Sequence, residues 1–246
     1  MSDEAKLAES AGFDWLTREN FKSYVVRRIR SKNPKSSRMY LIEAEGRRAV
    51  VKDLDQGSFF FRNIAAPIIA RREAEALRRL RGLDGVPRLF RLLDRRALVL
   101  SYVEGRPCSE IPQGELDAKF FDDLAALIRD IHARGVAHGD LKTAQNIIRR
   151  PDGRPCIVDF GAAFWPVPRW RVLSNYIYRL LRQTDWQGVY KLKRRHLPHL
   201  LTEEEREALE CAPLAVRLAH AYRRVYKWLK QRRQRSSPAT HHEPKN

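Results

Sequence analysis

The sequence predicts an α+β protein of two lobes, in which a small antiparallel β-sheet precedes a mainly helical part. Two observations carry this prediction. Short runs of alternating apolar residues dominate the first part of the chain, and apolar residues at helical spacing dominate the part that follows. The length of 246 residues allows a sizeable hydrophobic core, and 43% apolar residues exclude collagen-like and low-complexity classes.

The first lobe begins with three runs that have the period of β-strands. They cover residues 24–29, 39–44 and 49–54, and the segments between them, 31–37 and 44–47, have the composition of turns. Runs this short and this closely spaced predict a small antiparallel sheet.

A helix and two further strands complete this lobe. Helical periodicity extends over residues 64–83 and stops at Gly82 and the Asp-Gly pair that follows it. Strand-like runs come next at 87–93 and 97–102. We therefore expect one helix packed against the sheet.

Changes in composition divide the chain into four parts. The second lobe starts near Gly105, with helical periodicity over 118–134 and a loop-rich stretch from 135 to 161. The parts are an N-terminal extension (1–19), the first lobe (20–104), the second lobe (105–233) and a polar tail expected to be disordered (234–246).

Cysteine usage and the absence of long apolar segments bear on localisation. Cys108, Cys156 and Cys211 lie far apart, without the spacing of a zinc site. The N-terminus lacks the apolar core of a signal peptide, and the most apolar stretch, 59–70, is too short to span a bilayer. We expect a reduced cytoplasmic protein, with peripheral contact at the inner membrane face as a further expectation.

The loop-rich stretch contains two motifs at a fixed spacing. His138-Gly139-Asp140 is followed by Asn146, and Asp159-Phe160-Gly161 begins 13 residues after Asn146. A predicted hairpin over 147–158, turning at Pro-Asp-Gly, separates the two. In these motifs the sequence resembles the protein-kinase-like superfamily. The resemblance implies a bilobal kinase fold that binds ATP and Mg²⁺ and transfers a phosphoryl group.

That resemblance assigns roles to the residues of the stretch. Asn146 and Asp159 would hold Mg²⁺ through oxygen ligands, and Asp140 would accept the proton of the attacking hydroxyl. Lys142 would neutralise the transferred phosphate, and its presence favours Ser/Thr acceptors over small molecules. Gln145 competes with Asn146 as metal ligand, and we prefer Asn146 for its spacing to Asp159. We expect His138 to pack behind the loop.

The first lobe offers matching parts for gripping the nucleotide. By the same resemblance, Lys52 in the third predicted strand would pair with a helix glutamate. Glu73 is preferred to Glu75 because it shares a helix face with Leu77 and Leu80, whereas Glu75 is expected to pair with neighbouring arginines.

Two further nucleotide contacts follow from the resemblance, one with a departure from the family pattern. The run 98–107 resembles the hinge between lobes, where Ser101 and Val103 would contact adenine through their backbone. The loop expected to cover the phosphates, 31–37, contains no glycine. Ser36 and Ser37, with Lys35, are candidate substitutes as phosphate donors.

Other features narrow the relationship within the superfamily. Gly139 replaces the arginine that reads a phosphorylated activation loop in regulated kinases, and no Ala-Pro-Glu motif follows Gly161. The second lobe must be reduced, as in RIO-type kinases and lipopolysaccharide-core (Kdo/heptose) kinases. The runs 71–89, 137–146 and 185–205 resemble short proteobacterial proteins described as serine/threonine kinases, over about residues 20–210.

The charge of the chain bears on its partners. The net charge is +18, and the residues from Ala162 onward include 18 basic and 7 acidic side chains. The basic runs there have three alternative interpretations: solvated helix faces, a site for anionic lipid or lipopolysaccharide, or an RNA contact. For the second of these, Val225, Trp228 and Leu229 interleave with basic residues.

The sequence thus predicts an ATP- and Mg²⁺-dependent phosphotransferase with a protein Ser/Thr hydroxyl as first choice of acceptor. A lipopolysaccharide inner-core sugar is the alternative acceptor, which makes an anionic glycolipid the alternative partner. A hypothesis of another class is a catalytically silent, nucleotide-dependent binding module or an RNA-associated protein.

Overall fold

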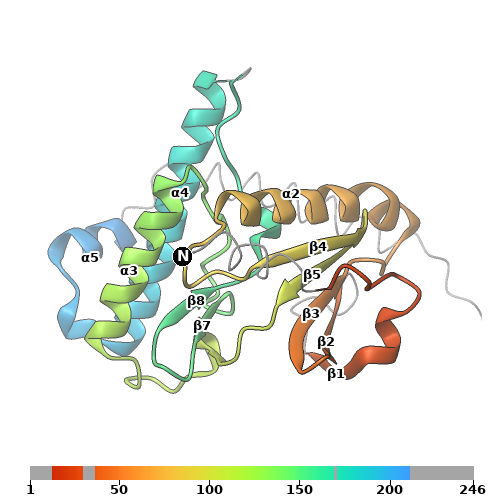
Figure 1. Ribbon diagram of the computed structural model, residues 1–246. Coiled ribbons are helices and arrows are strands. Elements are labelled where there is room, and N and C mark those ends of the chain that lie inside the picture. The colour runs from red at the N-terminus through yellow and green to blue at the C-terminus, as the bar shows by residue number, and fades with distance from the viewer. Residues whose placement is uncertain (1–12, 30–36, 169–170, 211–246) are drawn as a thin grey trace, which may run out of the picture.

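The computed structural model describes residues 13–29, 37–168 and 171–210, and it divides into a sheet lobe and a mainly helical lobe (Figure 1). The first lobe is a five-stranded antiparallel sheet with the strand order β1-β2-β3-β5-β4. This architecture confirms the α+β class and the small antiparallel sheet. The strands are β1 (Val25–Ile29), β2 (Arg38–Ala44), β3 (Arg47–Asp53), β4 (Leu89–Asp94) and β5 (Ala97–Ser101).

The central strand β3 is covered on both faces. Its residues from Ala49 to Asp53 are all buried, whereas the edge strand β1 is mostly exposed. On one face Leu98 and Leu100 of β5 pack in the same core as helix α2 (Ala66–Arg79). Because successive side chains of a strand point to opposite faces, Val99 contributes to a second core on the other face.

That second core includes residues that precede the first strand. Phe13, Leu16 and Phe21 are buried against the sheet, in one cluster with Ile42 and Val99. A sheet with apolar residues on both faces must be covered on both. The first lobe therefore extends at least to Phe13, and residues 13–19 are part of it rather than of the extension that the sequence suggested.

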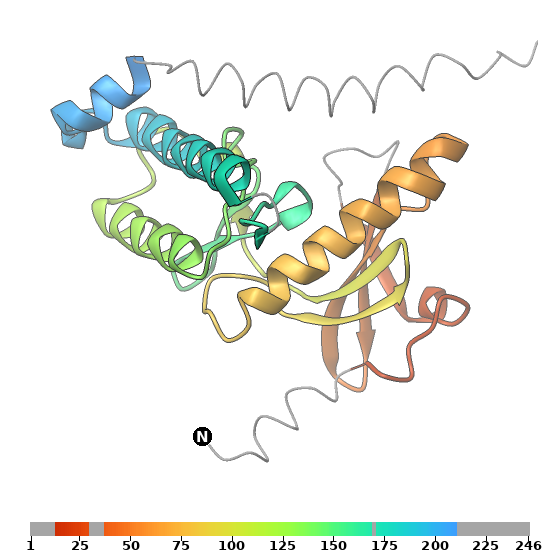
Figure 2. The same cartoon turned by 90° about the horizontal axis from the view of Figure 1, so that it is seen from above.

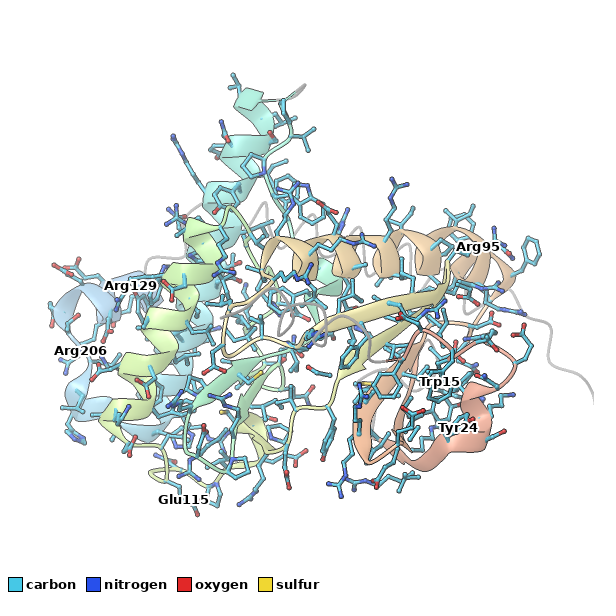
Figure 3. All side chains as sticks on the ribbon, in the orientation of Figure 1. Trp15, Tyr24, Arg95, Glu115, Arg129 and Arg206 are labelled. Atoms are coloured by element: carbon cyan, nitrogen blue, oxygen red, sulfur yellow. The ribbon has the colours of Figure 1, made fainter. Side chains whose placement is uncertain are left out.

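Aromatic side chains fasten this covering segment. The Phe13 ring meets the Phe90 ring edge-on, with a centroid distance of 5.1 Å. Trp15 and Tyr24 lie beside each other on the outer side of the sheet, with ring centroids 4.8 Å apart (Figure 3). Aromatic packing thus holds the segment, and no hydrophobic periodicity in its sequence predicts this packing.

Helical structure begins before α2, at residue 59, which is earlier than the periodicity over 64–83 indicates. A single π-helical turn, Phe61–Ala65, leads directly into α2, and Pro67 is tolerated because it lies in the first turn of the α-helical part. The helix ends at Arg79, and Gly82 follows with a φ of +78°. Seen from above, α2 runs across one face of the sheet (Figure 2).

The second lobe consists of helices around a small three-stranded sheet, β6-β7-β8. Asp117 caps α3 by accepting a hydrogen bond from the Phe120 N–H at 2.8 Å. Both views show α3 and α4 side by side (Figures 1 and 2). The elements are β6 (Arg106–Pro107), α3 (Ala118–Ala133), β7 (Ile147–Arg149), β8 (Pro155–Ile157), α4 (Arg171–His196) and α5 (Glu203–Glu210).

The two lobes meet at the turn between α2 and β4. The Ile157 N–H donates to the Gly85 carbonyl at 2.8 Å, and Asp84 pairs with Arg150 at 2.8 Å. A side chain at Gly85 would meet Leu127 of α3 at 2.8 Å, so glycine permits this close approach. The orientation of α2 is therefore set partly by the second lobe.

Two remaining expectations concern membranes and thiols. No helix in the described ranges is long and apolar enough to cross a membrane. Cys108 and Cys156 are free and buried, and burial raises the pKa of each thiol to about 12, which makes both unreactive near neutral pH. Cys211, the basic run that contains Trp228, and the tail lie outside the described residues.

Replacing Leu16 by alanine should destabilise the first lobe, because it removes a fully buried side chain from the core on the outer face of the sheet. We expect the free energy of unfolding to fall by about 2 to 5 kcal/mol, measured by urea denaturation. Asp14→Ala, at an exposed position of the same segment, is the control and should change little. Equal stability of Leu16→Ala and the wild type would show that the segment is not part of the lobe.

Candidate active site

A buried lysine ammonium joins three distant parts of the chain. Lys52 comes from the central strand β3, Glu73 from the inward face of α2, and Asp159 from the residues just after β8. Lys52 Nζ lies 2.5 Å from Glu73 Oε2 and 2.7 Å from Asp159 Oδ1. The side chains of Lys52 and Glu73 are 7% and 1% exposed, and that of Asp159 is 40% exposed. One member of the network thus faces solvent.

The charges of this network depend on one another. Burial disfavours the Lys52 ammonium, but the carboxylates of Asp159 and Glu73 outweigh it and hold the lysine pKa above its ordinary range. Burial raises the pKa of Glu73, against the attraction of Lys52, and the Phe160 N–H also donates to this carboxylate. The lysine therefore carries a permanent positive charge at the cleft.

Glu73, rather than Glu75, is the helix residue that reaches this lysine. Glu75 lies two residues after Glu73, on the half-exposed face of α2. Its Oε1 pairs with Arg79 Nε at 3.0 Å. This arrangement agrees with the choice made from the positions of Leu77 and Leu80, which are both buried. The helical periodicity was sufficient for this distinction.

The backbone after β8 bends sharply to present Asp159. Asp159 has left-handed dihedral angles, with φ 69° and ψ 64°, which are uncommon for a residue other than glycine. Phe160 is fully buried, and its ring meets His138 edge-on at 4.8 Å. A side chain at Gly161 would come within 3.0 Å of Ile69, so α2 packs closely against this turn.

His138 organises the loop that contains Asp140. Its Nε2 lies 3.0 Å from the Val158 carbonyl, and its Nδ1 accepts the Asp140 N–H at 3.1 Å. This pair of bonds suits the neutral ring with the proton on Nε2. His138 is 1% exposed, so it packs behind the loop, as expected from the sequence.

Asn146 faces this loop, and Gln145 does not. Asn146 is buried, and its amide nitrogen donates to the Asp140 carbonyl at 2.8 Å, whereas Gln145 is exposed. Because the amide nitrogen is occupied, the amide oxygen is the atom of Asn146 left for a cation. The Val158 N–H donates to the Asn146 carbonyl, which places Asn146 beside the strand that leads to Asp159.

Asp185 in α4 anchors this loop, and no motif in the sequence indicates this role. The Asp185 carboxylate is 1% exposed and accepts the backbone N–H groups of His138 and Gly139, both at 2.8 Å. It also lies 3.0 Å from His132 Nε2 of α3. An acidic residue on the buried face of a long helix was the available signal, since such a charge requires partners.

The approach of α4 to the loop is close. A side chain at Gly188 would lie 2.8 Å from the Leu141 carbonyl group, so only glycine allows the helix to pack there. Tyr178 of the same helix donates its hydroxyl to the His132 carbonyl at 2.6 Å. The loop with Asp140 and Lys142, both half-buried, thus rests on a rigid helical base.

The other predicted nucleotide contacts have different surroundings. The Ser101 N–H donates to the Arg88 carbonyl at 2.8 Å and its hydroxyl accepts the Arg88 N–H at 2.9 Å, so a backbone contact from Ser101 to a base must use its carbonyl oxygen. Val103 is half-buried in the connection after β5. Ser37 is buried just before β2, and Ser36 and Lys35 lie outside the described residues.

The donor set at the cleft suits a hard divalent cation that brings other ligands with it. Asp159 and Asn146 supply a carboxylate and an amide oxygen, which Mg²⁺ prefers. No cluster of three His, Cys, Asp or Glu side chains able to hold a metal exists within the described ranges. Mg²⁺ commonly takes one or two protein ligands together with phosphate oxygens and water, and this pair fits that pattern.

Comparison with known proteins places the chain in a fold but not in a family. No family model matches it. It is 32% identical over 97 residues to the KEOPS complex subunit Bud32 of Pyrococcus abyssi, a match covering 37% of this chain and 43% of that protein. The chain therefore matches less than half the length of that relative.

Solved structures extend the likeness to nearly the whole chain. Two structures of the Rio2 kinase from Chaetomium thermophilum superpose with a TM-score of 0.56, at 19% and 20% identity. They cover 92% of this chain and 77% and 79% of the kinase, and one is an ADP/Mg²⁺-phosphoaspartate complex. The likeness shows the fold: the chain has the protein-kinase-like fold that the sequence predicted.

Asp185→Asn should loosen the loop that contains Asp140, because the amide replaces one acceptor oxygen of the carboxylate by an NH₂ group. One of the three groups that contact this carboxylate would then face a donor instead of an acceptor. We expect a loss of about 1 to 3 kcal/mol in stability. If the chain transfers phosphate, misplacement of Asp140 should also lower kcat on the order of 100-fold with little change in nucleotide affinity.

Asp130→Asn, an exposed position on α3, is the matched control for this substitution. Nucleotide binding measured by calorimetry and turnover measured separately give the two readouts. An Asp185→Asn protein that keeps wild-type kcat would rule out the positioning role.

Proposed function

We propose that the chain is a phosphotransferase that moves the γ-phosphate of ATP to a serine or threonine hydroxyl of a protein acceptor. The observation that carries the proposal is the assembled network of Lys52, Glu73 and Asp159 next to the loop of Asp140 and Asn146. Phosphoryl transfer needs charge neutralisation and positioning more than covalent chemistry. This arrangement offers both.

Nucleotide binding is supported by the charge of the cleft. The Lys52 ammonium, held by Glu73 and bordering the solvent-facing Asp159, is suited to the α- and β-phosphates. The adenine would lie against the connection from Ser101 to Val103. The ADP and Mg²⁺ of the Rio2 structure, which shares this fold, support the same ligands here.

Asp159 and Asn146 are the residues that would hold Mg²⁺. The bound ion would neutralise charge on the phosphates during transfer. Asn146 is already oriented for this role by its bond to the Asp140 carbonyl, and Asp159 by the turn that Phe160 anchors. The protein therefore needs little rearrangement to bind the ion.

The transfer step itself falls to the loop residues. Asp140 accepts the proton of the acceptor hydroxyl as its oxygen bonds to the γ-phosphorus, and the bond from phosphorus to the ADP oxygen breaks. Lys142, two residues after Asp140, offsets the negative charge of the transferred group. The products are ADP and a phosphate monoester.

Asp140→Asn and Asp159→Asn should each abolish transfer, the first by removing the proton acceptor and the second by removing a metal ligand. Both should lower the rate by at least about 100-fold, measured as phosphate incorporated from radiolabelled ATP. Asp122→Asn, exposed on α3, is the control and should keep full activity. If Asp140→Asn and Asp159→Asn match the wild type, the proposal is wrong.

The chemistry of the labelled product tests the acceptor. Incubation with radiolabelled ATP and fractionated cell extract should give a protein-bound label that survives acid and hydroxylamine, as a serine or threonine monoester does. A label released by hydroxylamine would indicate an aspartyl phosphate, the group present in the Rio2 structure. A label in glycolipid would identify a sugar acceptor, and either result would refute the Ser/Thr assignment.

A further inference from the structure

A cavity lies away from the candidate active site, between β6–β7 and the segment that leads to α3. Its volume is about 210 Å³, and its walls include Arg106, Ile111, Glu115, Arg149 and Arg150. Glu115 marks its position at the edge of the second lobe in Figure 3. Arg149 lies three residues along the chain from Asn146, which separates the two sites by about 10 Å.

Two of the arginines face each other across a strand pair. Arg106 of β6 and Arg149 of β7 are direct antiparallel partners. Like charges in opposite positions destabilise a sheet. No ion pair joins either guanidinium to Glu115 or to another carboxylate in the described part of the chain. The two positive charges are therefore exposed to solvent where both residues line the cavity, and Glu115 is the one carboxylate among the described residues of its walls.

The third arginine has an unused donor. Arg150 donates from its two terminal nitrogens to the Asp84 carboxylate, at 2.8 and 3.1 Å. Its Nε is buried, with no hydrogen-bond acceptor in the described ranges. Arg150 is therefore held by Asp84, and its charge is already compensated.

The backbone fixes this arrangement. A side chain at Gly105, where φ is +144°, would lie 2.3 Å from the Arg149 carbonyl oxygen, so β6 and β7 approach closely at the cavity. Arg106 is oriented by donating to the Glu110 carbonyl at 3.1 Å. The Asp84 pair orients Arg150. Two of the three guanidinium groups are thus positioned before any ligand binds.

We propose that this cavity binds a phosphate group. A tetrahedral oxyanion would cancel the repulsion between Arg106 and Arg149 and accept hydrogen bonds from their planar guanidinium groups, which match its geometry. The site is separate from the nucleotide cleft and goes beyond the proposed transferase activity. Inorganic phosphate and a phosphate carried by a larger molecule share the chemistry that it recognises.

Thermal unfolding of the full chain in sodium phosphate, against sodium chloride of equal ionic strength, tests the site. Phosphate at ten times its Kd should raise the wild-type Tm by roughly 3 °C or more. Arg149→Gln should weaken phosphate binding by at least about tenfold, measured by calorimetry. In chloride the same variant should unfold at or above the wild-type Tm, because one of two repelling charges is gone.

Two controls locate the effect. Arg129→Gln, exposed on α3 and well separated from Glu115 in Figure 3, should respond to phosphate as the wild type does. Lys52→Ala should also keep the response, which separates this site from the nucleotide cleft. Three results would overturn the proposal. They are an equal Tm in chloride and phosphate, a phosphate-induced rise in Tm that Arg149→Gln retains, and a rise that Lys52→Ala loses.

The source of the phosphate can be separated in the same assay. A phosphoserine peptide and its unphosphorylated form are compared with inorganic phosphate, and binding of the phosphopeptide should depend on Arg149. Tighter binding of the phosphopeptide than of inorganic phosphate would favour a macromolecular ligand, and equal affinity the free ion. If the binding of neither ligand depends on Arg149, the site is refuted.

Discussion

The buried ammonium of Lys52 is the interaction on which the architecture of the site depends. A cation that is 6% exposed is tolerated only with charged partners in good geometry. Those partners come from α2 and from the turn after β8, which lie in different lobes. The pairing therefore requires the lobes to stay in register, and the docking of Gly85 and Asp84 on the second lobe helps to maintain that register.

A second buried charge supports the same site in a different way. Among the described residues, no Lys or Arg forms an ion pair with Asp185, which is stabilised by two backbone N–H groups and His132. Hydrogen bonds of this kind replace the water that a carboxylate would contact at the surface, and they favour its charged form. Glu73 orients the Lys52 charge, and Asp185 orients the backbone of the loop that carries Asp140. The geometry of the candidate site thus rests on two buried acids with distinct tasks.

The net charge of +18 acquires meaning from where the side chains lie. Many arginines form an ion pair with a carboxylate that lies beside them in the fold, as Arg150 does with Asp84 and Arg79 with Glu75. Arg106 and Arg149 are different, because strand pairing brings them together and neither forms an ion pair within the described part of the chain. An excess of positive charge indicates anionic partners in general. Only the juxtaposition of particular arginines indicates where such a partner would bind.

The sequence by itself determined the five strands of the first sheet, the helices α2 and α3, the two motifs around Asn146 and Asp159, and the preference for Glu73 over Glu75. These depend on local periodicity and on spacing along the chain, which are visible in one dimension. The role of Asp185, the covering of the sheet by Phe13 and Leu16, and the meeting of Arg106 with Arg149 were decided only by the tertiary structure. Each joins residues from separate elements, and the benefit or cost of the contact exists only once burial and strand pairing have brought the partners together.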